Sequence, residues 1–423
     1  MHESGKILDR PKCRMNETIY RTGLCVSETH AFYLGNVEDM HKRLRLYKEV
    51  GFNTIRVETG WGGIEPREGE FVTPACDTYF RAVKEEGLRF KMILGTVMAP
   101  AGWYNEKYPG NRLVDHNGRE CTGSPSFFAP HLREYLTRAL DHMFQYLADA
   151  DLLDSVDTMV VDFGPAGEPL YPPAWTQIPN GLDDPSGPEV FWGYDKYSQE
   201  NFRETMRLKY QTIEEANAAW EQDFRSFDEV VVPKPRTVRG RYWEDYLIWY
   251  RDAKRDFIVD QVKMFKAAIM KYSGGRIRPL MYIPGFNIRD DVWQEAVETG
   301  DGMGQVRIMC DSLFLVDTAR KYGCDLQYTG FENDYESRYL RRYMDLSGAG
   351  YIPFYGENAG GYDAVQYSRR LLDIIRETGM AGIDVTHSRF LFEEDGITVI
   401  KNIDLIKQAI KELQAYMKAG MTE

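Results

Sequence analysis

The sequence predicts an α/β fold, a (β/α)8 TIM barrel that carries a long helical insertion after its fourth strand. Two observations favour this fold. Short apolar runs alternate along the chain with stretches whose apolar residues recur at helical spacing, which is the pattern of βα units in a parallel sheet. About eight such runs occur in the 423 residues, and eight parallel strands close a barrel of this kind.

The predicted strands are short, mostly apolar and spread over the whole chain. They are Gly23–Glu28, Thr54–Thr59, Phe90–Thr96, Thr158–Phe163, Pro279–Ile283, Asp325–Gly330, Ile352–Gly356 and Gly382–Thr386. Amphipathic helical patterns lie between them or close the barrel. These are Val37–Val50, Cys76–Gly87, Pro130–Ala150, Asp363–Thr378 and Ile403–Lys418.

The connection after the fourth strand runs from Leu170 to Arg278, far beyond the length of an ordinary loop. It contains helical patterns of its own, at Tyr197–Leu208, Thr212–Glu221 and Trp243–Tyr272. The second of these opens on Thr212-Ile213-Glu214-Glu215, a capping box. We therefore expect residues 170–278 to form a helical excursion over the barrel mouth, within a single catalytic domain of residues 1–423.

Composition and charge narrow the classes of partner. The formal net charge is −13, and without a basic stripe such a surface repels nucleic acid. The six cysteines are scattered and form no C-x-x-C pair, as in reduced intracellular proteins. Neither an apolar signal segment nor a membrane-spanning apolar stretch is apparent. We expect a cytoplasmic protein with neither a nucleic-acid nor a membrane partner. Because barrels of this kind often associate, the formation of a homo-oligomer is an open possibility.

One segment points most directly to a reaction. The run Val160-Val161-Asp162-Phe163 stops at the corner Gly164-Pro165-Ala166-Gly167, and Glu168 follows at once. A turn just past a parallel strand is where barrels of this class hold catalytic groups. The next residues, from Leu170 through Tyr171 to Trp175, offer the flat apolar surface on which sugars rest. The alternative interpretation of Glu168 is a solvated loop glutamate.

Acidic residues also gather at the predicted ends of other strands, where the carboxyl groups would share one rim. They are Glu28, Glu58, Glu168, Glu332, Glu357 and Asp384. Like charges in one cleft raise each other's pKa, so a protonated carboxylic acid can stand beside an ionised one, as glycoside hydrolysis requires. The sequence thus predicts a hydrolase, a glycosidase of carbohydrate metabolism and polysaccharide degradation, acting on a soluble oligosaccharide by two carboxylates.

Further candidates for sugar binding lie near the same rim, Glu28 among them, and each has a structural alternative. Arg56 could orient a carboxylate or form a buried ion pair, and His387 could bind a sugar hydroxyl or cap a loop. Aromatic candidates could stack on sugar, donate a hydroxyl or simply pack in the core. These aromatic candidates are Trp61, Trp103, Tyr171, Tyr282 and Tyr328.

Other chemistries lack their motifs. There is no G-x-S-x-G elbow, no phosphate-binding G-x-x-x-x-G-K-[ST] loop and no H-E-x-x-H pair. We expect no cofactor and no metal. The open alternatives are a metal site built from the rim carboxylates, a barrel lyase or isomerase with a carboxylate base, and a non-catalytic sugar-binding barrel.

Several of these segments resemble the β-amylase family. Gly164-Pro165-Ala166-Gly167-Glu168 is similar to that family's general-acid motif, and Gly330-Phe331-Glu332-Asn333 lies where its general base is placed. Gly356-Glu357-Asn358-Ala359 resembles its strand-seven segment, and Trp61-Gly62-Gly63 the segment after strand two. The resemblance implies an inverting reaction with Glu168 as general acid and Glu332 as general base. Glu357 would orient sugar or water, and Glu58, Asn333 and Asn358 would bind sugar.

A second resemblance is to the bacterial TIM-barrel β-galactosidases of glycoside hydrolase family 42. It is carried by Glu65-Pro66-Arg67-Glu68-Gly69 and by the insertion from Thr212 to Trp220. It implies, as the alternative to the inverting mechanism that we expect first, a retaining β-glycosidase in which Glu168 is acid/base and Glu357 is the nucleophile. Gly167 replaces the asparagine that precedes the acid there, and Ala99 to Trp103 replaces the β-amylase lid. The sugar, its anomer, the linkage and activity on starch therefore stay open.

Overall fold

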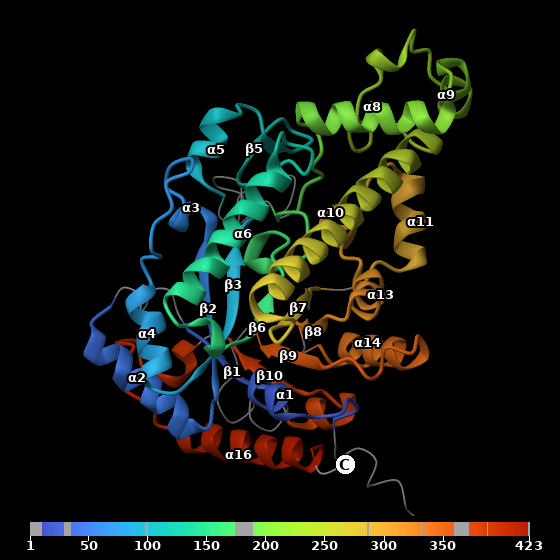
Figure 1. Cartoon of the computed structure of the whole chain (residues 1–423). Coiled ribbons are helices and arrows are strands. Elements are labelled where there is room, and N and C mark those ends of the chain that lie inside the picture. The colour runs from blue at the N-terminus through green and yellow to red at the C-terminus, as the bar shows by residue number, and fades with distance from the viewer. Residues whose placement is uncertain are drawn as a thin grey trace, which may run out of the picture.

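A closed barrel of eight parallel strands forms the centre of the protein (Figure 1). The computed structural model describes residues 11–28, 35–97, 100–173, 189–285, 287–330, 333–358, 372–386 and 388–421. Around the barrel the strands are β1 Leu24–Ser27, β2 Thr54–Gly60, β3 Arg89–Gly95, β6 Val156–Val160, β7 Arg278–Ile283, β8 Asp325–Tyr328, β9 Phe354–Asn358 and β10 Gly382–Val385. This order confirms the predicted (β/α)8 fold.

Parallel pairing on both sides of the first strand closes the barrel. Cys25 of β1 is in register with Thr54 of β2 and with Asp384 of β10. Successive side chains of a strand point to opposite faces. Thus Arg56 reaches residues of β7, β9 and β10 across the barrel, while its neighbours Ile55 and Val57 are buried in the apolar core.

Helices surround the barrel, and most of the predicted ones are confirmed. α2 begins where Asn36 accepts the backbone N–H groups of Glu38 and Asp39, and it ends at Gly51, whose φ of 110° favours glycine. The helices before β7 are α1 Glu17–Thr22, α2 Val37–Val50, α3 Trp61–Ile64, α4 Asp77–Glu85, α5 Gly102–Lys107, α6 Leu132–Asp149, α8 Lys196–Tyr210, α9 Ile213–Trp220 and α10 Arg241–Ser273. Those after β7 are α11 Asp290–Thr299, α12 Gly304–Arg307, α13 Ser312–Tyr322, α14 Asp334–Leu346 and α16 Ile403–Ala419.

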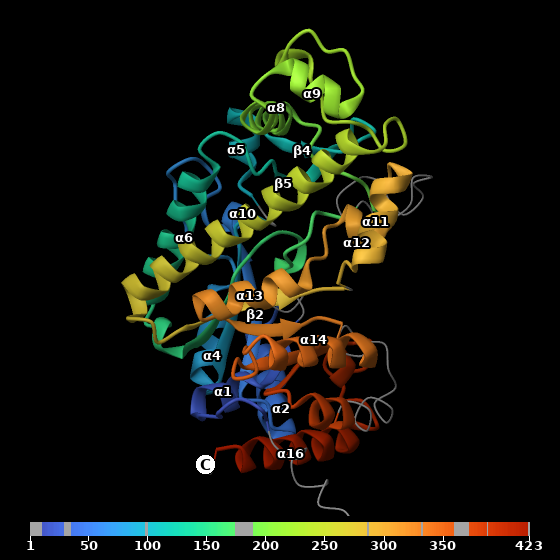
Figure 2. The ribbon, with the colours of Figure 1, turned by 90° about the vertical axis from the view of Figure 1, so that its right-hand side faces the viewer.

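The long connection after β6 is helical, as the capping box predicted. Thr212 accepts the backbone N–H of Glu215 at the start of α9. Figure 1 and Figure 2 show α8 and α9 on the same side of the molecule as α3 and α5, with α16 on the opposite side. A second apolar cluster, which includes Phe191, Trp192 and Trp243, packs these helices together. The assignment of the whole chain to one domain stays a prediction.

Helix α10 joins this second cluster to the barrel wall. Its first half, from Tyr242 to Tyr250, belongs to the second cluster, and its second half, from Ile258 to Ile269, belongs to the barrel core. It packs against α6 and β7. Among the helices that the structure describes, none is both long enough and apolar enough to cross a bilayer.

Some elements differ from those predicted. A hairpin of β4 (Arg112–Val114) and β5 (Glu120–Pro125) and the helices α11 to α14 were not among the predicted elements. The strand predicted at Ile352–Gly356 is β9, which begins at Phe354, two residues later than predicted. It extends to Asn358, so Glu357 is within the strand. Of the predicted helix Asp363–Thr378, residues 363–371 lie outside the described residues, and 372–378 are helical.

Candidate active site

A short, tightly turned loop carries Glu168 from the end of β6. Gly164 has φ 155° and Gly167 φ 78°, values that favour glycine, and Ala166 between them has φ 56°. Pro165–Gly167 forms a single 3-10 turn, closed by the backbone N–H groups of Gly167 and Glu168. The Gly-Pro-Ala-Gly sequence therefore allows the chain to turn at once and to present Glu168 beyond the strand.

Glu168 is held so that it keeps its proton near neutrality. Its surroundings raise the pKa of the carboxyl to about 7, first because the group is withdrawn from water and also because Glu357 is negatively charged. The Thr329 hydroxyl donates to Glu168 Oε1 at 2.7 Å and lowers the pKa, as does the charge of Arg56. Burial prevails, so the carboxyl group keeps its proton up to about pH 7.

Glu357 lies in a different environment, among several donors. It accepts hydrogen bonds from Arg56 Nη1 at 2.6 Å, from Gln327 Nε2 at 2.7 Å and from Thr386 Oγ1 at 3.0 Å. Arg56 also donates to the Tyr282 hydroxyl at 3.2 Å. An ion pair with a guanidinium and two further donors suits an ionised carboxylate. Only 7% of Glu357 is exposed.

The donors of Glu357 continue into a polar network inside the barrel. Lys91 Nζ donates to Gln327 Oε1 at 2.7 Å and lies 3.3 Å from Asp384 Oδ2, and both charged side chains are fully buried. Ser27 Oγ donates to Asp384 Oδ1 at 2.8 Å. Burial tends to raise the pKa of Asp384, but Lys91 and Arg56 prevail and hold it below its ordinary value. The network fixes the base of the site with paired charges.

The structure thus brings five of the predicted residues together, namely Arg56, Glu168, Tyr282, Glu357 and Asp384. Glu58 lies on the same side of β2 as Arg56 and is partly exposed. Asn333 caps α14, where its side chain accepts the backbone N–H of Glu336. Glu332, His387 and the side chain of Asn358 lie outside the described residues, so their predicted roles stay predictions.

Glu28 faces the surrounding helices. Its carboxylate pairs with Arg43 at 2.6 Å and accepts the hydroxyls of Tyr47 at 2.7 Å, Tyr79 at 3.0 Å and Ser388 at 2.6 Å. These partners come from α2, α4 and the segment after β10. The network gives Glu28 a structural role that needs no sugar, and its predicted part in binding stays a prediction.

The predicted aromatic residues are mostly packed against other rings. Trp61 is fully buried, meets Trp103 edge to face at 5.7 Å and donates to Glu65. Tyr171 stacks on Tyr250 at 3.9 Å. The buried Tyr328 donates its hydroxyl to the Gly285 carbonyl at 3.1 Å. These contacts match the packing alternative for Trp61, Tyr171 and Tyr328, whereas Trp103 is only partly buried.

Sequence reasoning missed several residues that hold the two carboxyl groups. They are Lys91, Gln327, Thr329 and Thr386. The sequence offered one signal, because Lys91, like Arg56, is a charged residue within an apolar strand. The structure pairs these two residues on neighbouring strands. Within the described ranges, no group of three or more His, Cys, Asp or Glu side chains is arranged to hold a metal ion.

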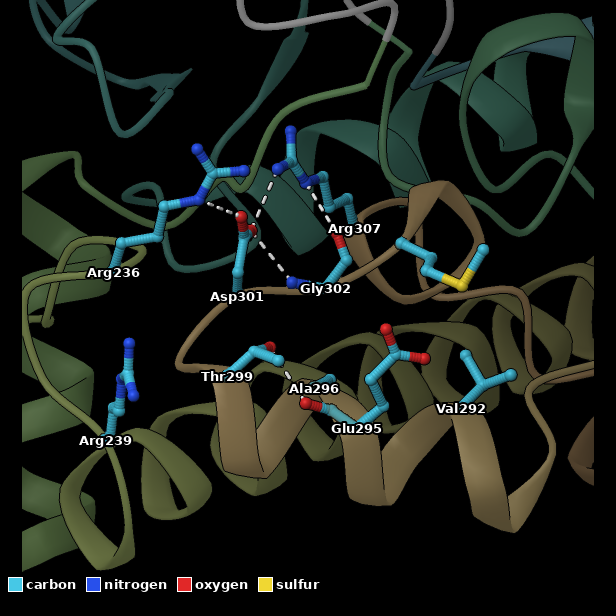
Figure 3. Close-up of a pocket in the computed structure, with 10 residues that line it drawn as sticks. Arg236, Arg239, Val292, Glu295, Ala296, Thr299, Asp301, Gly302 and Arg307 are labelled. Atoms are coloured by element: carbon cyan, nitrogen blue, oxygen red, sulfur yellow. Dashed lines mark hydrogen bonds and ion pairs between the residues drawn. The ribbon is translucent and has the colours of Figure 1, made fainter.

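A separate hollow of about 470 Å³ lies between α11 and the connection that precedes α10 (Figure 3). Three arginines line it, and Asp301 accepts from Arg236 at 2.7 Å and from Arg307 at 2.8 Å. Arg239 and Glu295 face the space from opposite sides (Figure 3). None of the predicted site residues is among its lining residues, so this hollow is separate from the candidate site around Glu168 and Glu357.

A comparison with protein families identifies the family of this chain. The sequence profile of glycoside hydrolase family 42, described as beta-galactosidase, matches residues 32–150 and 183–288, which together exceed half of the chain. The chain belongs to this family. The matched residues include α10 and the strands that carry Arg56 and Lys91. Both families suggested by the sequence motifs also occur among the similar proteins.

Curated relatives are similar over part of their length. A beta-amylase of Bacillus cereus is 24% identical over 237 residues, which cover 51% of this chain and 42% of the relative. A beta-galactosidase of Thermus, named BgaA, is 27% identical over 237 residues, covering 52% of this chain and 31% of the relative. The matches therefore span less than half of these relatives.

Solved structures share the fold over nearly the whole chain. The catalytic domain of the beta-amylase from Paenibacillus polymyxa superposes with a TM-score of 0.75 at 19% identity, covering 91% of this chain and 97% of that one. A beta-galactosidase from Bacillus circulans gives a TM-score of 0.66 at 14% identity, covering 94% and 57%. At these identities the likeness establishes the TIM-barrel fold.

Proposed function

We propose that this protein is a retaining glycoside hydrolase in which Glu168 is the general acid and base and Glu357 is the nucleophile. The observation that carries the proposal is the contrast between the two carboxyl groups. Glu168 keeps its proton to about pH 7, whereas Glu357 receives an ion pair and two hydrogen bonds. Glycoside hydrolysis needs one carboxyl group in each of these states.

In the first step, a Glu357 oxygen attacks the anomeric carbon while the glycosidic C–O bond breaks. The Glu168 proton passes to the leaving oxygen, so an alcohol departs and a glycosyl ester remains on Glu357. In the second step, the Glu168 carboxylate takes a proton from water as that water attacks the anomeric carbon. The ester bond breaks, and both residues return to their starting states.

Arg56 is expected to support both steps because it contacts Glu357 directly. Its ion pair orients the attacking oxygen, and its position inside the barrel is set by Asp384 at 3.7 Å and by Tyr282. The fully buried Lys91 and Gln327 complete the support from below. Such preorganised surroundings reduce the rearrangement needed when charge moves during the reaction.

The names of the relatives suggest the first substrates to try. Proteins called beta-galactosidase and beta-amylase are both similar to this chain, so aryl β-galactosides, lactose and soluble starch head a wider panel of oligosaccharides. The runner-up mechanism is inverting, with Glu332 as general base. It rests on the sequence motif around Glu332, a residue outside the described part of the chain.

The stereochemistry of the first product separates the two mechanisms. Proton NMR during hydrolysis should show the sugar released first with the anomeric configuration of the substrate. Release of the opposite anomer would contradict the assignment of Glu357 as nucleophile and favour the mechanism with Glu332. Absence of turnover on the whole panel would instead favour a sugar-binding barrel without catalysis.

Azide can test the two roles separately, because it is an anionic nucleophile that attacks without the help of a general base. With Glu168→Ala and an activated aryl glycoside, azide should attack the glycosyl ester and yield a glycosyl azide of retained configuration. With Glu357→Ala, azide should attack the substrate directly and yield the inverted product. The reverse pattern would exchange the two assignments. Glu168→Gln should also lower kcat/KM on poor leaving groups by ~10²–10⁴-fold.

A further inference from the structure

A buried lysine holds both ends of the loop that carries Glu168. Lys254 Nζ, from α10, donates to the Phe163 carbonyl at 3.0 Å and to the Leu170 carbonyl at 2.7 Å. Only 1% of Lys254 is exposed. The two carbonyls flank the turn from Gly164 to Glu168, so one ammonium group bridges the entry and the exit of this loop.

The same face of α10 makes further contacts with the loop. Gln261 Nε2 donates to the Asp162 carbonyl at 2.9 Å, just before the turn. Tyr171, just after it, donates its hydroxyl to the Tyr250 carbonyl at 3.0 Å. Residues 250, 254 and 261 are spaced to lie along one side of a helix. The acid loop is therefore attached along one line of α10, with Lys254 at its centre.

The pocket around the lysine suits an amino group that binds carbonyl oxygens. Its nitrogen lies over the rings of Phe127 at 4.9 Å, Tyr171 at 5.6 Å and Phe257 at 5.6 Å, and a cation is attracted to such faces. Burial lowers the pKa of Lys254 to about 7, although Asp162 acts to raise it. A neutral amine still has two hydrogens for two carbonyls, so the bridge survives in either protonation state.

We propose that Lys254 is a positioning residue for the general acid, because it fixes both ends of the loop and thereby the place of the Glu168 carboxyl. This inference rests on the proposed role of Glu168. A long aliphatic residue such as leucine or methionine would suit this ring-lined site as well for packing alone. The bridge between two loop carbonyls is what distinguishes the lysine.

The test uses Lys254→Met, which keeps the straight chain and removes the donor. kcat/KM is measured on a series of aryl glycosides that the wild type hydrolyses, from unactivated to dinitrophenyl leaving groups. A displaced acid matters only where the leaving oxygen needs a proton. We expect a loss of about 10–10²-fold on the poorest leaving group, part of the ~10²–10⁴ that general acid catalysis supplies, and a loss under about threefold on the dinitrophenyl substrate.

Lys266→Met is the matched control, because Lys266 lies on the same helix and donates to the Tyr322 carbonyl far from the loop. It should leave kcat/KM unchanged throughout the series. An equal loss on all leaving groups, or no loss, in Lys254→Met would overturn the proposal. If that variant does not fold by circular dichroism, Lys254→Gln, which keeps a donor, is measured in the same way and should show a smaller loss of the same pattern.

Glu168→Gln, measured in parallel, separates this inference from the proposed function. If it shows strong dependence on the leaving group while Lys254→Met shows none, the inference fails and the role of Glu168 stands. If Glu168→Gln shows no such dependence, or if no glycoside is hydrolysed, the proposed function fails and the inference fails with it.

Discussion

Glu168 and Glu357 act on each other electrostatically, but the regions that hold them differ in kind. Glu357 rises from the barrel interior, where charges are paired across strands and Arg56, Gln327 and Thr386 all donate to it. Glu168 lies on a loop that is hydrogen-bonded to α10 near aromatic rings, and the Thr329 hydroxyl donates a hydrogen bond to its carboxyl group. The barrel interior therefore favours an ionised Glu357, whereas the surroundings of the loop favour a protonated Glu168.

This difference shows how one barrel can give two glutamates opposite roles. The residue type is the same, so the surroundings must decide which carboxyl group attacks and which one donates. The polar interior also costs free energy, because buried charges lose their hydration, and their ion-pair and hydrogen-bond partners must offset that loss. Four changes can break or sharpen the comparison, from the largest expected effect to the smallest.

Removing the charge from the polar side should have the largest effect. Glu357→Gln keeps the shape and removes the attacking oxygen, so kcat should fall roughly 10⁴–10⁶-fold, as when one member of a catalytic unit is lost. Steady-state kinetics on an activated aryl glycoside measure the loss, and circular dichroism checks the fold. A loss of less than tenfold would make Glu357 a supporting residue and end the comparison.

Glu28 offers a carboxylate that is saturated with partners on the helix side of the barrel. Glu28→Gln removes the negative charge that pairs with the buried Arg43, so the free energy of unfolding should fall by about 3–5 kcal/mol. The kcat and KM of the protein that remains folded should be unchanged. Denaturant unfolding and kinetics at low temperature measure the two quantities. A raised KM with unaltered stability would instead support the predicted sugar contact of Glu28.

The proton on Glu168 should make stability depend on pH in a defined window. Its pKa is raised from 4.5 to about 7, so between these values the folded protein binds a proton that the unfolded chain has released. The free energy of unfolding therefore falls as the pH rises from 4.5 to 7. Glu168→Gln lacks this titration.

The variant should accordingly be the more stable protein at pH 8, by up to about 3 kcal/mol, and the difference should shrink toward pH 4.5. Urea unfolding of both proteins across this range measures it. A difference that does not change with pH would mean that Glu168 is ionised at neutrality, and the contrast between the two regions would be lost.

The smallest change is at Thr329, whose hydroxyl stabilises the charged form of Glu168. The kcat/KM of the wild type should decline as the pH rises past about 7, because Glu168 then loses its proton. Thr329→Val should raise the pKa of Glu168 further and move this decline to higher pH. Thr329→Ser keeps the hydroxyl and should follow the wild type. A shift to lower pH would contradict the assigned hydrogen bond.

The barrel and the place of Glu168 could be predicted because both depend on local sequence. Strands buried on both faces are recognisable as apolar runs. The turn from Gly164 to Gly167 is recognisable from its glycines, which adopt the positive φ values that the turn needs. The start of β9 was placed two residues too early because Ile352 is apolar and buried like the residues of the strand itself.

The partners of the two carboxyl groups could not be predicted, because they depend on contacts between distant parts of the chain. Lys91 meets Gln327 and Asp384 only once the barrel has closed. A tryptophan such as Trp61 looks the same in sequence whether it faces a sugar or three other rings. The bridge from Lys254 to the acid loop likewise spans 84 to 91 residues.

Helix α10 gives the protein a stiff lever between its two ends. With 33 residues it is about 50 Å long, and its first half is anchored among the rings of the distal helices while its middle grips the acid loop. Its second half packs in the barrel core, so a movement of the first half would tilt the helix about that fixed half and shift its middle. Truncating or destabilising α8 and α9 would therefore displace the carboxyl group of Glu168, although these helices lie far from it.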